Sequence, residues 1–263
     1  MTKHYAVLGS PISHSKSPII HTAAFTALGE DSDYQAIELA GDLADFMTKQ
    51  GAGFQGFSLT MPLKEEALNF AERADSLAIG TGAANTLVKT ESGWDAYNTD
   101  VFGIQQAVSG LRFRTVSVIG TGATARSAIV AMQELDKPVT LWGRNPASVR
   151  QLSAEFDVSS QPLLHKACEA DLVISTLPPR ALEEHLPNLK TAPGGVLLDV
   201  AYDPWPSKAA ELWGKDRTIS GIEMLLWQAL GQQRLFAGND LDEPLENEKE
   251  LLQAIRSALN MAK

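Results

Sequence analysis

Two runs of polar residues stand where an apolar run gives way to a helical pattern. Residues 58–64 read Ser-Leu-Thr-Met-Pro-Leu-Lys and place Lys64 in the first turn of a helix. A lysine there opposes the positive end of the helix dipole, so it is mildly unfavourable for stability and calls for another explanation. Residues 98–100 read Asn-Thr-Asp. Asp100 is a candidate for a functional site, and the simpler alternative is that it is the N-cap of a helix beginning at Val101.

A third run, residues 9–18, is unusually rich in hydroxyl groups. Its sequence is Gly-Ser-Pro-Ile-Ser-His-Ser-Lys-Ser-Pro, with four serines between the end of one apolar run and the start of the next helix. Strand ends that face a cleft are where such sheets bind small molecules, and hydroxyls there can donate to a carboxylate or to sugar-like hydroxyls. The alternative is ordinary capping, with Ser17 as the cap of a helix beginning at Pro18.

A glycine-rich turn in the middle of the chain predicts a dinucleotide site. Residues 120–125 read Gly-Thr-Gly-Ala-Thr-Ala, after a predicted strand at 115–119 and at the start of a predicted helix. In that context the glycines allow a pyrophosphate to approach the backbone and the N-terminus of the helix. The next strand ends in Arg144 instead of the carboxylate that binds the ribose of NAD, which favours NADP.

The elements that must position these residues alternate between strand and helix. In the first segment we expect strands at 4–9, 54–60, 83–89 and 94–97 and helices at 18–28 and 62–74. In the second we expect strands at 115–119, 139–142, 172–175 and 196–200 and helices at 101–108, 124–135, 147–156 and 181–186. Such alternation predicts a parallel, doubly wound sheet. Two apolar helical segments, 222–236 and 245–259, come too late to extend that sheet.

These patterns predict an α/β protein whose two α/β domains flank a cleft. The first domain comprises residues 1–101, completed by the C-terminal helices of residues 222–263 that pack back on it. The second is a Rossmann-type domain at 102–221, with a doubly wound parallel sheet.

Composition excludes several classes of protein. The 263 residues carry a formal net charge of −10, which argues against nucleic acid or an anionic membrane as a partner. The longest apolar runs are too short for a transmembrane helix. Cys168 is the single cysteine, so a reducing, cytoplasmic location is expected. The five histidines lack the spacing of a metal site, so no metal is expected.

Taken together, these runs resemble the shikimate dehydrogenase family over nearly the whole chain. The resemblance includes the hydroxyl-rich run at 9–18, Thr60-x-Pro62-x-Lys64, Ala84-Asn85-Thr86 and Asn98-Thr99-Asp100. It continues through the glycine turn at Gly120, Tyr202-x-Pro204 and Gly221-x-x-Met224-Leu225-x-x-Gln228. It implies reversible NADPH-linked reduction of 3-dehydroshikimate to shikimate, on the path to aromatic amino acids, by a monomer or homodimer.

The resemblance also implies a role for each matched residue. Lys64 and Asp100 would be the catalytic pair. The substrate carboxylate would be held by Ser15, Ser17 and Tyr202, and its hydroxyls by Thr60, Asn85, Asp100 and Gln228. The cofactor phosphates would be held by Gly120, Thr121, Gly122, Ala123, Thr124 and Arg144. Val200 and Gly221 would lie near the nicotinamide.

The chain departs from the family pattern in places. Ser58 stands where the family usually has Asn, and Val101 follows Asp100 where the family usually has Gly. Ser148 stands where a second cofactor-binding arginine is usual, and Arg150 is two residues away.

Two alternatives remain at this stage: a quinate/shikimate dehydrogenase that uses NAD, and a catalytically inactive relative that binds a metabolite of the pathway.

Overall fold

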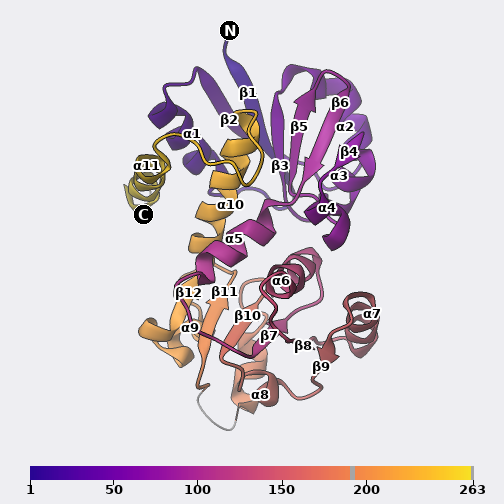
Figure 1. The fold of residues 1–263 in the computed structure, drawn as a ribbon, viewed down its shortest axis with the longest axis vertical. Coiled ribbons are helices and arrows are strands. Elements are labelled where there is room, and N and C mark those ends of the chain that lie inside the picture. Colours follow the sequence, from indigo (N-terminus) through magenta and orange to yellow (C-terminus); the bar gives the residue numbers. More distant parts are fainter. Residues whose placement is uncertain (190–192, 262–263) are drawn as a thin grey trace. The chain divides into compact units, whose positions relative to one another are not determined.

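The computed structural model describes residues 1–189 and 193–261. The chain forms two compact units, one of residues 1–103 with 226–263 and the other of residues 104–225 (Figure 1). The division falls inside two helices, α5 (Thr99–Val108) and α10 (Gly221–Phe236). The domain ranges expected from the sequence were 1–101 with 222–263, and 102–221.

The first unit contains a mixed, six-stranded sheet in the order β2-β1-β3-β5-β6-β4. Its strands are β1 (Lys3–Gly9), β2 (Ser32–Glu38), β3 (Gly56–Leu59), β4 (Arg73–Ala74), β5 (Thr86–Thr90) and β6 (Gly93–Tyr97). Strand β1 runs parallel to β2 and β3, whereas β5 runs antiparallel to β3 and β6. The reversal at β5 brings the start of that strand to the edge where β3 ends, which matters for the site described below.

Helices on this sheet bury apolar side chains against it. They are α1 (Ser17–Leu28), α2 (Leu43–Gln50), η1 (Gly51–Gly53), α3 (Lys64–Phe70) and α4 (Ser76–Thr81), and the same unit contains α11 (Glu248–Met261) from the C-terminal segment. Helix α11 packs against α1. Its buried residues Leu251, Ile255 and Leu259 follow the helical spacing seen in the sequence. The C-terminal segment therefore contributes to the core of the first unit.

The second unit is a six-stranded sheet whose strands all run parallel, in the order β12-β11-β10-β7-β8-β9. The strands are β7 (Val116–Ile119), β8 (Val139–Trp142), β9 (Ser159–Ser160), β10 (Leu172–Ser175), β11 (Val196–Asp199) and β12 (Thr218–Ser220). The helical segments are α6 (Ala123–Gln133), α7 (Pro146–Phe156), α8 (Leu164–Ala167), η2 (Glu183–Asn188), α9 (Lys208–Trp213) and η3 (Lys215–Arg217). The parallel α/β fold expected here is confirmed.

Several local expectations need correction. The pair β2 and α2 was not predicted, and α4 was missed as well. The helix expected at 62–74 is shorter, because Ala71 is already extended and the next residues pair with β6 as β4. The helix expected at 181–186 is a 3₁₀ segment, η2, with Pro187 inside it.

Among the residues that the structure describes, no helix is both long enough and apolar enough to cross a lipid bilayer.

Candidate active site

Four strand ends meet at one edge of the first sheet. Leu8 near the end of β1 pairs with Leu59 at the end of β3, and Ser58 of β3 pairs with Thr86 at the start of β5. Thr86 in turn pairs with Tyr97, the last residue of β6. The polar runs that follow β1, β3 and β6, and the one that precedes β5, therefore lie along the same edge. Residues from four distant parts of the sequence are gathered there by sheet topology.

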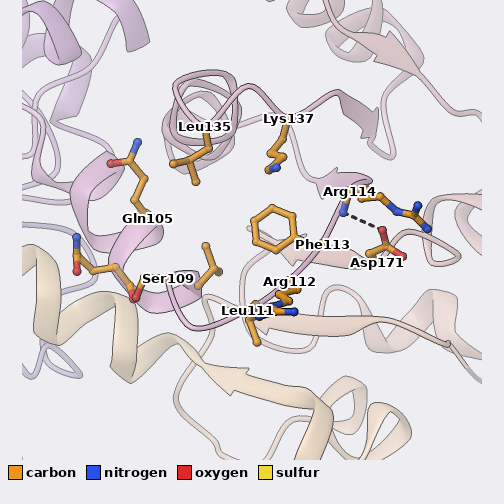
Figure 2. Close-up of a pocket in the computed structure, with 11 residues that line it drawn as sticks. Gln105, Ser109, Leu111, Arg112, Phe113, Arg114, Leu135, Lys137 and Asp171 are labelled. Atoms are coloured by element: carbon orange, nitrogen blue, oxygen red, sulfur yellow. Dashed lines mark hydrogen bonds between the residues drawn. The ribbon is translucent and has the colours of Figure 1, made fainter.

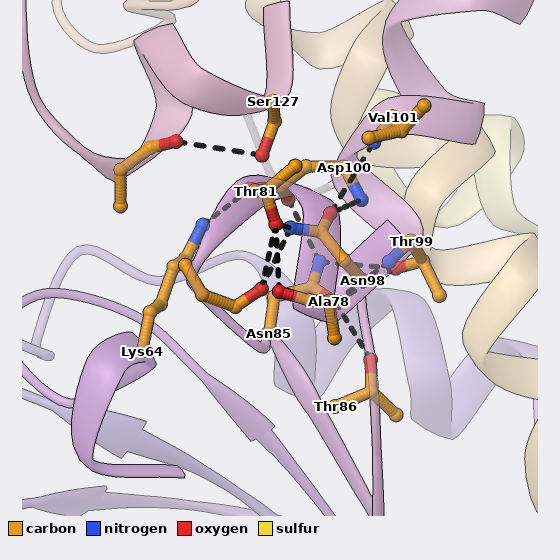
Figure 3. A network of polar contacts seen from close by, with 12 residues as sticks. Lys64, Ala78, Thr81, Asn85, Thr86, Asn98, Thr99, Asp100, Val101 and Ser127 are labelled. Atoms are coloured by element: carbon orange, nitrogen blue, oxygen red, sulfur yellow. Dashed lines mark hydrogen bonds and ion pairs between the residues drawn. The ribbon is translucent and has the colours of Figure 1, made fainter. Parts of the chain in front are cut away.

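Lys64 and Asp100 form an ion pair at this edge (Figure 3). The Lys64 Nζ atom donates to Asp100 Oδ2 at 2.5 Å, with side-chain exposures of 12% and 1% respectively. Lys64 is the first residue of α3, which begins after a turn in which the Leu63 N–H donates to the Thr60 carbonyl. A buried carboxylate facing the ammonium offsets the unfavourable position of a lysine at a helix N-terminus.

Asn98, and not Asp100, caps helix α5. Asn98 Oδ1 accepts hydrogen bonds from the backbone N–H groups of Asp100 at 3.0 Å and Val101 at 3.4 Å. Its Nδ2 atom donates to Thr81 Oγ1 and to the Ala83 carbonyl. The N-cap role considered for Asp100 is therefore wrong, and its side chain is free of the helix backbone to face Lys64.

Asn85 fixes the second oxygen of the Asp100 carboxylate. Its Nδ2 atom donates to Asp100 Oδ1 at 2.7 Å and to Thr99 Oγ1 at 3.0 Å. Its Oδ1 atom accepts from the Thr99 N–H and from the hydroxyls of Thr86 and Thr99. Both carboxylate oxygens of Asp100 thus receive donors in a buried setting, which holds the side chain in one orientation.

In the hydroxyl-rich run after β1, the N-cap of α1 is Lys16, whose side chain makes no capping hydrogen bond, and not the expected Ser17. Ser17 is the first residue of α1 rather than its cap, and its N–H donates to Ser15 Oγ at 3.3 Å. The loop is also held by Glu38, at the end of β2, which accepts from Ser10 Oγ at 2.6 Å and from the Ile12 N–H at 3.0 Å. These bonds lower the pKa of the Glu38 carboxyl. Sequence reasoning missed Glu38 because it missed β2.

The remaining predicted substrate residues are divided between the two units. Thr60 follows β3 and is half-buried at the same edge as Lys64. Gln228 is half-buried in α10 and belongs to the first unit, whereas Tyr202, also half-buried, belongs to the second. The structure therefore groups Lys64, Asp100, Asn85 and Thr60, and the role of Tyr202 stays a prediction.

In the second unit, the glycine turn occupies the end of β7. Gly120 has φ of +127°, and a Cβ atom there would lie 2.2 Å from Thr176 Oγ1. Only glycine allows the chain to turn this closely past the end of β10. Helix α6 begins directly after Gly122, and the cap residue has no side chain to accept from the first turn. The turn leaves backbone N–H groups at a helix N-terminus, where a phosphate can bind.

The neighbouring loops complete this edge. Arg144 is exposed after β8, and a Cβ at Gly143 would lie 2.8 Å from Thr121 Cγ2, so the two loops are in contact. A Cβ at Gly221 would lie 2.1 Å from the Val200 carbonyl, so these two predicted nicotinamide neighbours are adjacent. Ser148 lies in the first turn of α7, where its N–H donates to the capping Asn145.

The second unit also has an open pocket of about 840 Å³ at a different place (Figure 2). Its lining includes Arg112, Phe113, Arg114 and Lys137, and the Lys137 Nζ atom lies 5.7 Å from the centroid of the Phe113 ring. Asp171 accepts from the N–H groups of Arg114 and Thr115 at its edge. The lining residues differ from every predicted site residue.

Two family models match the chain. The model for the shikimate dehydrogenase substrate binding domain matches residues 7–87. A model described as NADP oxidoreductase, coenzyme F420-dependent, matches residues 115–202. The first match covers the run after β1, Lys64 and Asn85, and the second covers the glycine turn and Arg144.

Whole-chain relatives agree with these models. The NADP(+) shikimate dehydrogenase of Methanococcoides burtonii is 36% identical, covering 91% of this chain and 94% of the relative. The crystal structure of Mycobacterium tuberculosis shikimate dehydrogenase is 36% identical, with a TM-score of 0.85 over 98% of this chain and 99% of that one. A Thermus thermophilus shikimate 5-dehydrogenase, solved with NADP(H) and shikimate, is 30% identical, with a TM-score of 0.84 over 97% and 99% of the two chains. The sheet edges, the glycine turn and these likenesses agree, and the chain belongs to the shikimate dehydrogenase family.

Proposed function

We propose that this chain catalyses the reversible NADP(H)-linked interconversion of shikimate and 3-dehydroshikimate, a step towards chorismate and the aromatic amino acids. The observation that carries the proposal is the Lys64–Asp100 pair, with 2.5 Å between Nζ and Oδ2 at a sheet edge lined by hydroxyl and amide groups. Such a pair can manage a proton next to a substrate hydroxyl.

Lys64 is assigned the proton transfer. As an ammonium group it donates to the ketone oxygen of 3-dehydroshikimate while the carbonyl carbon is reduced, and it stabilises the negative charge that develops on that oxygen. Asp100 holds the lysine by the ion pair and accepts from a neighbouring hydroxyl of the substrate. Bound NADPH supplies the hydride. In the oxidative direction the proton of the same hydroxyl returns to Lys64.

The other residues of the first unit are assigned to substrate binding. Thr60, Asn85 and Gln228 bind ring hydroxyls, and Ser15 and Ser17 bind the carboxylate together with Tyr202. Neutral donors can bind a carboxylate when several of them converge, and each bond to a charged acceptor is worth roughly 1.5–3 kcal/mol.

The cofactor is assigned to the edge of the second unit. The turn at Gly120 is tight, because a Cβ there would meet Thr176, and it leads directly to the N-terminus of α6, whose N–H groups can bind a pyrophosphate. Thr121, Gly122, Ala123 and Thr124 complete this turn, and Arg144, exposed after β8, is assigned to the 2′-phosphate. Val200 and Gly221 are assigned to the nicotinamide side.

The test is an absorbance assay at 340 nm with purified protein and shikimate, comparing NADP with NAD. We expect turnover with NADP and a much higher KM for NAD. Replacing Arg144 with alanine should raise the KM for NADP about tenfold to a hundredfold and leave the KM for NAD nearly unchanged. The same assay is run with quinate and NAD. Faster turnover of quinate with NAD than of shikimate with NADP would support the quinate alternative, and no turnover of either substrate would support the inactive relative.

Two further expectations accompany the proposal. A reducing, cytoplasmic location follows from the single cysteine, Cys168, which is buried. A monomer or a homodimer is the expected assembly.

A further inference from the structure

A buried glutamine lies behind the proposed catalytic pair. Gln232 is in α10, one turn after Gln228, and only 1% of it is exposed. None of the motifs singled out in the sequence includes it. A buried amide is costly unless its donors and acceptors are satisfied, so its partners are informative.

All four hydrogen-bonding positions of the Gln232 amide are used. Its Oε1 atom is 3.0 Å from Ser58 Oγ and 3.0 Å from His21 Nε2. Its Nε2 atom donates to Thr86 Oγ1 at 3.0 Å and to the Asn85 carbonyl at 3.2 Å. An amide has two acceptor and two donor positions, so this group is fully satisfied and held in one place.

The surrounding groups fix which way the Gln232 amide points. His21 is completely buried, and burial lowers its pKa to about 3, so the ring is neutral. Gln233 Nε2 donates to His21 Nδ1 at 2.7 Å, which leaves the ring hydrogen on Nε2, facing Gln232 Oε1. Tyr34 donates its hydroxyl to Ser58 Oγ at 2.6 Å, so the Ser58 hydrogen is also directed to Oε1. Two donors therefore mark this atom as the carbonyl oxygen.

The hydrogen bonds from Gln232 continue through Thr86 and Asn85 to Asp100, each with a defined donor and acceptor. The Thr86 hydroxyl accepts from Gln232 Nε2 and donates to Asn85 Oδ1 at 2.9 Å. The Thr99 N–H donates to the same Oδ1 atom at 2.9 Å, and with both donors on Oδ1 the Nδ2 of Asn85 is the atom that donates to Asp100 Oδ1 at 2.7 Å (Figure 3). A reversed Asn85 amide would place a carbonyl oxygen against the Asp100 carboxylate.

We propose that Gln232 is a positioning residue for the reaction proposed above, acting through Thr86, together with the Thr99 N–H, to hold the orientation of Asn85 and hence of Asp100. This inference rests on the proposed function and adds a residue to it. Gln232 is assigned no contact with the substrate, because Thr86 and Asn85 stand between its amide and Asp100 in this series of hydrogen bonds.

The test uses two matched pairs of variants. Gln232→Met removes the amide from the relay. Its control Gln233→Met removes an adjacent amide that is equally buried, at 1% exposed, and that bonds to His21; Ser58 still donates to Gln232 Oε1 in that variant and keeps the Gln232 amide in its orientation. Thr86→Val removes only the hydroxyl that links Gln232 to Asn85, and its control Thr86→Ser keeps that hydroxyl. If Gln232→Met fails to fold, the Thr86 pair decides the question.

Each relay variant should lower kcat/KM for shikimate about tenfold, with a rise in the KM for shikimate and an unchanged KM for NADP. The two controls should stay within about twofold of the parent. A purely structural role would lower the amount of active enzyme and leave both KM values unchanged. The proposal is overturned if Thr86→Val matches Thr86→Ser, or if Gln232→Met matches Gln233→Met. A parent enzyme that does not oxidise shikimate would instead refute the proposed function.

Discussion

The two sheets present their candidate sites in different ways. In the first unit the edge is built from side chains, with Lys64, Asp100 and Asn85 bonded to one another in a mostly buried network. In the second unit the edge is built from backbone, with Gly120 allowing a close turn and Arg144 exposed next to it. The same strand-end geometry thus supports recognition by oriented side chains in one case and by main-chain groups in the other.

The difference has a physical basis. A ring with several hydroxyls needs donors and acceptors at defined positions, and these require side chains held by further hydrogen bonds. A pyrophosphate needs only several N–H groups and a positive dipole end, which any helix N-terminus offers once glycine lets the ligand approach. Substitutions should therefore act mainly through polar side chains in the first unit, and through backbone shape as well as the Arg144 side chain in the second.

The largest effect is expected at Lys64. Lys64→Ala should lower kcat by about 10²–10⁴, because a positioned acid–base group contributes that much, with little change in the KM for NADP. The measurement is steady-state turnover of shikimate with saturating NADP. Lys49→Ala is the control, since Lys49 is an exposed lysine paired with Asp45 on the surface. Near-native kcat for Lys64→Ala at all pH values would remove the acid–base assignment.

The backbone character of the second edge is tested at Gly120. Gly120→Ala places a Cβ at a φ of +127° and 2.2 Å from Thr176 Oγ1, which should cost about 1–3 kcal/mol of stability and raise the KM for NADP. The KM for shikimate should stay unchanged. Urea unfolding and steady-state kinetics measure both. Gly110→Ala is the control, because its Cβ would meet open space. Equal behaviour of the two variants would contradict the close-approach argument.

The burial of His21, which bonds to Gln232 in the first unit, is tested by the dependence of stability on pH. The folded pKa of His21 is lowered to about 3, below its ordinary value of about 6.5, so its contribution to stability is complete above pH 6.5 and is lost as the pH falls. Between pH 7.5 and pH 5, His21 should therefore remove about 2 kcal/mol from the free energy of unfolding.

Urea unfolding of the parent and of His21→Gln at these two pH values isolates this effect, because all other titrating groups are common to both proteins. We expect the parent to lose about 2 kcal/mol more than the variant between the two pH values. Equal losses in parent and variant would show that the ring is accessible to protons in the folded state.

The smallest effect is expected in the loop after β1. Ser15→Ala removes the acceptor of the Ser17 N–H, a long bond of 3.3 Å, so about 0.5 kcal/mol of stability should be lost together with a several-fold rise in the KM for shikimate. Ser17→Ala removes no cap and should raise the KM without that loss. Thermal unfolding and kinetics separate the two. A greater loss of stability for Ser17→Ala would restore the capping role first expected for Ser17.

Short-range patterns in the sequence were sufficient for much of this protein. The strand expected at 139–142 is present with those bounds, the helix expected at 147–156 is α7, and the helix expected at 18–28 ends at Leu28 before Gly29, whose φ is +69°. Each depends on residues within a few positions of one another, through turn geometry, capping or helical spacing. The glycine turn and the family motifs belong to the same class of local signal.

Tertiary structure alone decided which of the polar residues act together. Capping logic offered Asp100 as the N-cap of α5, and only the hydrogen bonds from the Asp100 and Val101 N–H groups to Asn98 Oδ1 show that Asn98 is the cap. Gln232 meets Thr86 across 146 positions of the chain, and such a contact leaves no periodic trace in the sequence. The physical reason is that local patterns report the backbone conformation of neighbouring residues. The pairing of buried donors and acceptors depends instead on which distant segments the sheet and its helices bring together.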